Sequence, residues 1–206
     1  VDVDEAGLQS LCTEVSDIAG GVSTYMVDVS DRTAMERLPQ HVVDTHGSVD
    51  VLINNAGISM RALVKEVSID TLKNVMDINF WGAVYCTKAA LPFITQNKGV
   101  IVGVSSIAGY RGLPGRSGYS ASKYALNGWL EALKTELEIN FGDAIRYADF
   151  DISFSGETYS INITNLNEFV TQAQTGSDAA SIAAFAESYI YEKIVESLRR
   201  DTMKGD

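Results

Sequence analysis

The chain has 206 residues, of which 46% are hydrophobic and 21% are charged, a balance typical of one soluble domain with a sizeable core. Its formal net charge of −11 at pH 7 argues against nucleic acid or an anionic membrane as the main partner. There is no apolar run of membrane-spanning length and no opening signal peptide, and the two cysteines are typical of buried thiols in a reducing compartment. Composition therefore predicts a cytoplasmic protein, unless targeting information precedes Val1.

Four helices are expected in the first 141 residues. An apolar stripe predicts the first over residues 4–16, and the second spans 31–46, between an aspartate cap and a glycine. Longer helical patterns cover residues 70–96 and 119–141.

Strands are expected between these helices, at residues 22–29, 49–53 and 99–104. The last two are nearly pure apolar runs, as expected when helices cover both faces of a sheet. Strands that alternate with helices predict a parallel α/β sheet, whose ligands bind beyond the carboxyl ends of the strands.

Each predicted strand ends in a polar or glycine-containing turn. Asp28 and Val29 end the first strand, Asn54-Asn55-Ala56-Gly57 follows the second, and Ser105-Ser106-Ile107-Ala108-Gly109 follows the third. A small, backbone-exposing turn lets a ligand approach closely. The three turns therefore indicate one site at the carboxyl edge of the sheet.

The helix after the third turn carries Tyr119 and Lys123, which are four residues apart and so lie on one helix face. Free tyrosine has a pKa of about 10, and a nearby positive charge favours the phenolate, which makes the pair suited to acid/base chemistry. The pair alone is common on amphipathic helices, so it indicates a catalytic site only together with the turns around it. His41 and His46 are five apart on a helix and support no metal site or Ser–His triad.

Together, Asn54-Asn55-Ala56-Gly57, Asn79, Ser106 and Tyr119-x-x-x-Lys123 resemble the motifs of the short-chain dehydrogenase/reductase family, in its compact single-domain branch. The resemblance runs from residue 1 to about residue 146. It implies a Rossmann-like, doubly wound, mostly parallel sheet and a bound NAD or NADP. The implied reaction is hydride transfer between that cofactor and a small-molecule carbonyl or alcohol.

The resemblance also implies a role for each matching residue. Tyr119 would be the general acid/base, and Lys123 would lower the pKa of Tyr119 and bind the nicotinamide ribose. Ser106 would hold the substrate oxygen, with Ser105 one residue out of the expected spacing. Asn79 would hold a water that links Lys123 to solvent. The residues implied to contact the cofactor are Asp28, Val29, Asn54, Ala56, Gly57, Tyr119 and Lys123.

Residues of two loops would surround the reacting carbon, among them Ile58 and Arg116 with Ser106. They are mostly apolar, which favours a medium-sized, partly hydrophobic substrate. The long helices at 70–96 and 119–141 resemble those that pack between subunits in the family, which implies a homodimer or homotetramer.

The sequence departs from the family at its start, because it contains no Gly-x-x-x-Gly-x-Gly or Gly-x-Gly-x-x-Gly turn for the pyrophosphate. We therefore expect an N-terminally truncated sheet. If the chain is complete, strands 22–29 and 49–53 pair directly or the fold is unstable. The alternative to an enzyme is a non-catalytic remnant or oligomerisation module without cofactor binding.

A second departure follows residue 146. Apolar and polar residues alternate on both sides of Ser155-Gly156-Glu157, which favours a β-hairpin over a distorted sixth strand. We expect a single domain over 1–206, with a family-like core at 1–146, a hairpin or lid at 147–176 and an amphipathic helix at 177–200.

Overall fold

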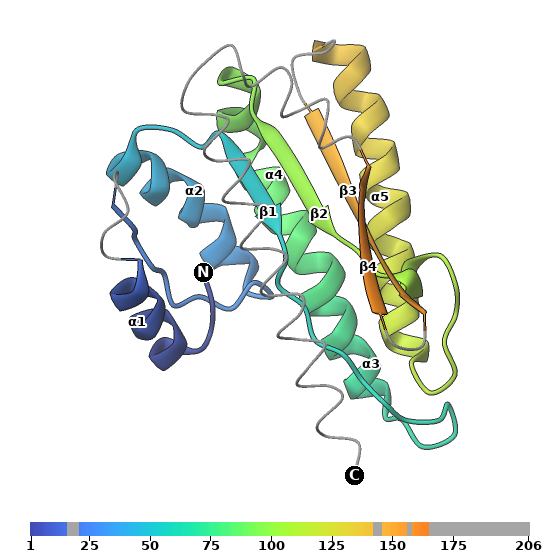
Figure 1. Cartoon of the computed structure of the whole chain (residues 1–206). Helices are drawn as coiled ribbons and strands as arrows, with labels where there is room; N and C mark the ends of the chain where they lie inside the picture. Colours follow the sequence, from blue (N-terminus) through green and yellow to red (C-terminus); the bar gives the residue numbers. More distant parts are fainter. Residues whose placement is uncertain (16–20, 142–145, 156–157, 165–206) are drawn as a thin grey trace. The chain divides into compact units, whose positions relative to one another are not determined.

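The computed structural model describes residues 1–15, 21–141, 146–155 and 158–164 (Figure 1). The chain divides into two compact units, Val1–Tyr147 and Ala148–Asp206, and each is described by itself. Within the described residues, no helix combines the length and the apolar character that crossing a membrane requires.

Helices of the first unit begin where capping side chains bind free backbone N–H groups. The carboxylate of Asp4 accepts from the amide of Gly7, that of Asp31 accepts from Ala34, and the hydroxyl of Ser68 accepts from Thr71. These residues precede α1, α2 and α3. The helices are α1 (Glu5–Glu14), α2 (Arg32–His46), α3 (Ile69–Met76), a π-helical turn (Asp77–Trp81), α4 (Gly82–Gln96), a 3₁₀ turn (Ile107–Gly109) and α5 (Ser117–Phe141).

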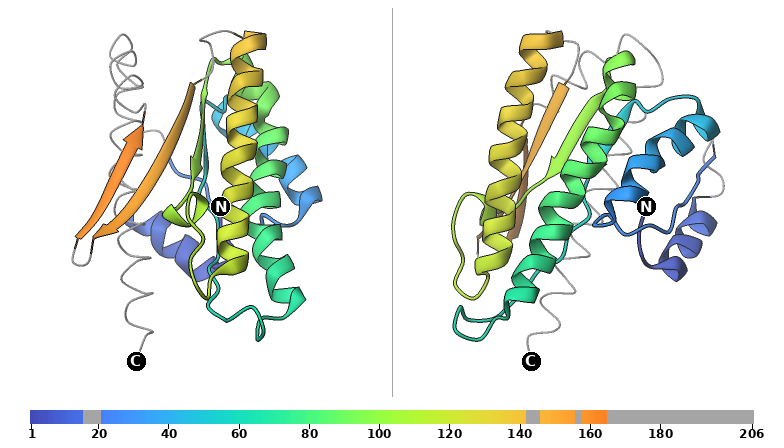
Figure 2. Two further views of the ribbon diagram at one scale, coloured as in Figure 1. Left: turned by 90° about the vertical axis from the view of Figure 1, so that its right-hand side faces the viewer. Right: turned by 180° about the vertical axis from the view of Figure 1, so that it is seen from behind.

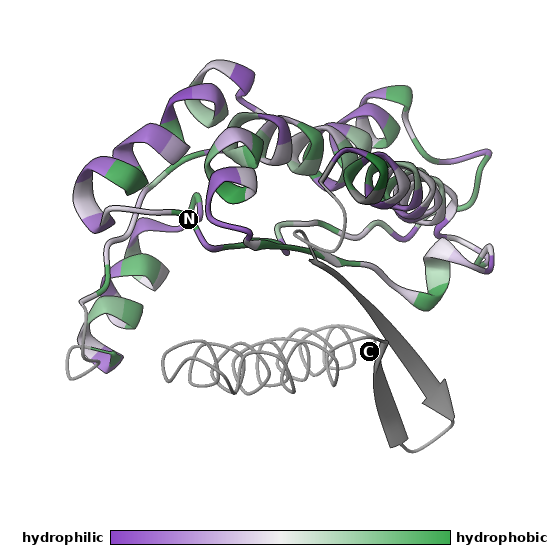
Figure 3. Cartoon of the chain, turned by 90° about the horizontal axis from the view of Figure 1, so that it is seen from above, coloured by the Kyte–Doolittle hydropathy of each residue, from purple (hydrophilic) through white to green (hydrophobic). Residues whose placement is uncertain are grey.

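Two parallel strands, β1 (Val51–Asn54) and β2 (Val100–Val104), form the sheet of this unit, with Val51 opposite Val100 and Asn54 opposite Gly103. Figures 2 and 3 show α4 and α5 on the same side of these strands. Gly103 allows α5 to pack closely, because a Cβ on this residue would collide with Leu130. The core between the strands and helices is formed by Ala83, Ala90, Ile94, Ile101, Leu126, Leu130 and Leu137.

The strand expected at residues 22–29 is not formed. This segment is extended, but its ladder consists of one isolated parallel bridge between Met26 and Asp2, with the Val27 amide donating to the Asp2 carbonyl at 3.0 Å. Among the described strands, β1 pairs with β2 and occupies an end of the sheet order. The direct pairing of 22–29 with 49–53, one of the two alternatives expected for a complete chain, is therefore not formed among the described residues. A β-rich sequence forms a strand only when a neighbouring edge supplies hydrogen-bond partners.

The strand β3 (Arg146–Ser155) begins at the end of the first unit, and its residues in the second unit pair antiparallel with β4 (Thr158–Thr164). Phe150 lies opposite Ile163, Ile152 opposite Ile161 and Phe154 opposite Tyr159, so the apolar positions of the two runs share a register. This pairing confirms the β-hairpin predicted from the alternation. The helix expected at 177–200 and residues 165–176 of the expected lid lie outside the described residues.

Candidate active site

A polar stripe on α5 faces the end of β2. Tyr119, Lys123 and Asn127 are spaced by four residues, and they are respectively half-buried, 4% exposed and 7% exposed. The helix that carries them begins where the Ser120 amide donates to the Arg116 carbonyl at 2.8 Å. One rigid element therefore holds all three side chains.

Lys123 is buried beside Tyr119. Its Nζ donates to the carbonyl oxygen of Val104, the last residue of β2, at 2.7 Å, and lies 5.9 Å from the centroid of the Tyr119 ring. Burial lowers the pKa of the Lys123 ammonium to about 8, because the charged form loses its hydration. At pH 7 the side chain is still mostly protonated. The structure thus brings a positive charge close to the Tyr119 ring, as the sequence spacing predicted.

The two serines after β2 point to different surroundings. Ser105 is 3% exposed and donates its hydroxyl to Asn127 Oδ1, while Asn127 Nδ2 donates to the Gly109 carbonyl at 3.3 Å. Ser106 is half-buried, and its Oγ accepts from the Ala108 amide at 3.2 Å. Ser105 is therefore committed to the core, which leaves Ser106 as the serine nearer to the surface.

Asn127 is a site residue that the sequence analysis missed. It ties the 3₁₀ turn that follows Ser106 to the helix of Tyr119, through Ser105 and Gly109. Its spacing of four residues from Lys123 was the available signal, but its partners come from a distant part of the chain.

Asn79 lies in the π-helical turn and is 1% exposed. Its Oδ1 accepts from the Ile58 amide at 2.7 Å, and its Nδ2 donates to the Ile58 carbonyl at 2.9 Å and to Ser122 Oγ at 3.0 Å. Both N–H donors of the amide are thus used. Asn79 fastens the turn after β1 to α5, one residue from Lys123.

The turn after β1 offers backbone rather than side chains. Asn54 Nδ2 donates to Thr87 Oγ1 at 2.9 Å inside the core, whereas residues 55–59 are exposed. Gly57 is tightly backed, because a Cβ there would lie 3.2 Å from Asn79 Oδ1. Residues 55–57 are therefore open to a ligand, although the Asn55 amide already donates to the Ile53 carbonyl at 3.1 Å.

Asp28 and Val29 precede α2. Asp28 is exposed and its Oδ1 accepts from the Ser30 amide at 2.8 Å and from the Ser30 hydroxyl at 2.7 Å. Val29 contacts the start of α4 so closely that a Cβ on Gly82 would lie 2.8 Å from Val29 Cγ2. Val29 thus packs against α4 at Gly82, which is three residues after Asn79.

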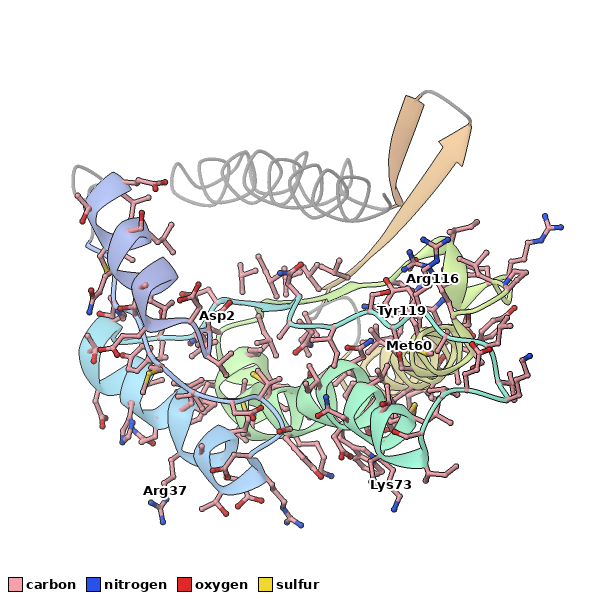
Figure 4. All side chains as sticks on the ribbon, turned by 90° about the horizontal axis from the view of Figure 1, so that it is seen from below. Asp2, Arg37, Met60, Lys73, Arg116 and Tyr119 are labelled. Atoms are coloured by element: carbon pink, nitrogen blue, oxygen red, sulfur yellow. The ribbon has the colours of Figure 1, made fainter. Side chains whose placement is uncertain are left out.

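Two loops meet at the first turn of α5. The Ala62 amide donates to the Gly115 carbonyl at 2.9 Å, and Arg116 Nη1 donates to Ser59 Oγ at 2.5 Å. Figure 4 shows Arg116, Tyr119 and Met60 close together at this place. Ile58, at 36% exposure, belongs to the same loop as Ser59. The described residues include no group of three or more metal-ligating side chains.

Comparison with known proteins identifies the family. A model of the short chain dehydrogenase family matches residues 1–141. Dehydrogenase/reductase SDR family member 7C of Xenopus tropicalis is 36% identical over 161 residues, which make up 78% of this chain and 47% of that protein. The 3-oxoacyl-(acyl-carrier-protein) reductase FabG of Thermotoga maritima is 35% identical over 137 residues, 66% of this chain and 56% of that protein. The chain spans about half the length of these curated relatives.

Solved structures show the same fold. A metagenomic short-chain oxidoreductase in complex with NADP superposes with a TM-score of 0.67 at 24% identity, covering 74% of this chain and 68% of that one. An alcohol dehydrogenase from Thermococcus sibiricus, complexed with 5-hydroxy-NADP, gives a TM-score of 0.65 at 22% identity, covering 72% of this chain and 61% of that one. Sequence and fold agree, and the chain belongs to the short-chain dehydrogenase/reductase family.

Proposed function

We propose that this chain carries the catalytic region of an NAD(P)-dependent oxidoreductase that interconverts an alcohol and a carbonyl. The observation that carries the proposal is the buried Lys123 ammonium beside Tyr119, on a helix that also anchors the Ser106 turn through Asn127. Membership of the short-chain dehydrogenase/reductase family supports it.

Tyr119 is the general acid/base of this proposal. In reduction it gives its phenolic proton to the carbonyl oxygen, and in oxidation it takes the proton of the alcohol. The Lys123 ammonium favours the phenolate because it is held close to the ring in a poorly hydrated place. Ser106 hydrogen-bonds the same substrate oxygen and fixes its position. Asn79 holds Ile58 and Ser122 through its side chain and so supports the turn after β1 against α5; a water bound there as a proton relay remains part of this proposal.

The residues present fit a dinucleotide. The exposed residues 55–57 and the Asp28–Val29 turn would hold its adenosine side, with Asn54 supporting the turn after β1 from the core. Lys123 has one N–H bonded to Val104, and its other two are suited to ribose hydroxyls. When bound, the nicotinamide supplies or accepts the hydride.

The proposal also includes an oligomeric state and a cellular compartment. Trp81 is 42% exposed and stacks on Tyr85 of α4, with ring centroids 5.9 Å apart, which supports packing of α4 and α5 against a second copy in a homodimer or homotetramer. Cys12 and Cys86 are free thiols, which suits the reducing cytoplasm.

Titration with NADPH and NADH, followed by turnover of a panel of carbonyl compounds, tests the proposal. We expect sub-millimolar cofactor binding and a turnover that Tyr119→Phe abolishes. Tyr124→Phe is the matched control, because Tyr124 lies on the same helix and is 47% exposed. No binding at millimolar cofactor would instead favour a non-catalytic remnant.

A further inference from the structure

Positive charge gathers on the two loops that meet beside Tyr119. Residues 55–66 and 105–119 contain four cations, Arg61, Lys65, Arg111 and Arg116, and one acid, Glu66, in a chain whose net charge is −11. A carboxylate oxygen of Glu66, Oε1, lies 3.7 Å from Nζ of Lys65, its neighbour in sequence. The three arginines are therefore not neutralised by any acid within their own loops.

Backbone contacts bring two of these arginines together. Because the Ala62 amide donates to the Gly115 carbonyl, Arg61 and Arg116 lie on directly bonded neighbouring segments. Arg116 is half-buried, and the bond from its Nη1 to Ser59 Oγ uses one of its five N–H donors. Arg61 and Arg111 are exposed, and neither guanidinium forms an ion pair or a hydrogen bond with another described residue; the backbone amide of Arg111 donates to the Ile107 carbonyl at 2.9 Å.

Arg116 is also placed toward the reacting group. It is the residue just before α5 and precedes Tyr119 by three positions in the sequence. Figure 4 shows the two residues close together, whereas Arg37 and Lys73 point away from the molecule. A guanidinium with unused donors at the start of this helix would meet a group close to the reacting carbon.

Apolar side chains share the same loops. Ile58, Leu63 and Tyr110 are 36%, 51% and 50% exposed. A ligand that met both kinds of side chain would carry an anion near its carbonyl and an apolar group beyond it. Carboxylate is the matching anion, because its two oxygens accept in parallel from the fork of an arginine.

We infer that Arg116, assisted by Arg61 and Arg111, binds the carboxylate of the substrate, so that the substrate class is amphipathic oxo acids and the corresponding hydroxy acids. This inference rests on the proposed function for its turnover step alone. The binding step can be measured without any reaction.

The test compares benzoylformate with benzoylformamide, which share a carbonyl and a phenyl ring and differ in charge. Calorimetry on the full chain, with and without saturating NADP, gives both affinities. We expect benzoylformate to bind about tenfold more tightly than benzoylformamide, because one well-formed charged contact changes the dissociation constant by about this factor. Arg116→Gln, which keeps a donor for Ser59, should reduce the ratio to within twofold, and Arg116→Lys should leave it intermediate.

Arg37→Gln is the control, because it removes the same charge from the outer side of α2. It should leave the ratio unchanged, and thermal melting should show that all variants fold. Equal affinities of the two compounds, a ratio that Arg116→Gln does not change, or no binding of either compound would each overturn the inference. Selective binding of benzoylformate without turnover would support the inference and count against the proposed function. Equal turnover of both compounds would support the proposed function and overturn the inference.

Discussion

Replacement of Lys123 by methionine should make the folded chain more stable at pH 7 and less stable at pH 10. Methionine matches the length of the apolar stem and removes a charge that is 4% exposed. The pKa of the ammonium falls from 10.5 to about 8 on burial. At about 1.4 kcal/mol for each pKa unit, the buried charge costs about 3 kcal/mol of folding free energy at pH 7.

The variant also loses a hydrogen bond. The Val104 carbonyl, which accepts from Nζ at 2.7 Å, would be left without this donor, at a cost of about 1–3 kcal/mol. The net effect at pH 7 is a gain of about 1 kcal/mol. Under the proposed function, Lys123 is then a residue whose chemical role is gained at the expense of stability.

The pH dependence follows from the direction of the pKa shift. Between pH 8 and 10.5 the unfolded chain holds a proton on Lys123 that the folded chain has released, so the stability of the wild type rises with pH. The cost of the buried charge falls to about 1 kcal/mol at pH 10, and the advantage of methionine should reverse there.

Urea unfolding at pH 7, 8, 9 and 10, followed by tryptophan fluorescence, measures this reversal. Lys88→Met is the matched control, since it removes the same charge from an exposed position of α4. A Lys123→Met variant that is destabilised at pH 7, or whose difference from the wild type stays constant with pH, would refute the reasoning.

Three further predictions concern the supports of the site. Asn127→Ala should cost about 2–4 kcal/mol in urea unfolding, because it leaves the buried Ser105 hydroxyl and the Gly109 carbonyl unpaired, and an unchanged unfolding midpoint would count against these two bonds. Gly118→Ala should lower stability by about 1–3 kcal/mol, because its Cβ would lie 2.6 Å from Leu72 Cδ2; an unchanged melting temperature would contradict this packing. Burial raises the pKa of the Cys86 thiol to about 11, so alkylation by iodoacetamide at pH 8 should be slow in the folded chain and fast in urea, and equal rates would show that this thiol is not buried.

Local chemistry made much of the fold predictable. Asp31 caps its helix as its position indicated, and the alternation after residue 146 gave the hairpin. The four-residue spacing likewise placed Lys123 beside Tyr119. In each case the deciding interaction is formed by residues close together in the sequence.

Contacts between residues far apart in the sequence were the part of the structure that the sequence did not predict. The β-rich run at 22–29 did not become a strand, because strand formation depends on an edge supplied by another segment. Asn127 was missed because its partners, Ser105 and Gly109, are 22 and 18 residues away. Periodicity also predicted one continuous helix over 70–96, where a π-helical turn at Asp77–Trp81 carries the buried Asn79.

The most direct test of the account is isotope transfer. A reduced cofactor deuterated at the transferred position should place one deuterium on the carbinol carbon of each product molecule, as measured by mass spectrometry. Tyr119→Phe should abolish this transfer while cofactor affinity falls by no more than about tenfold, because the phenol handles the proton and contributes at most one hydrogen bond to the cofactor. Transfer by Tyr119→Phe at the wild-type rate, or an alcohol product without deuterium, would contradict the account.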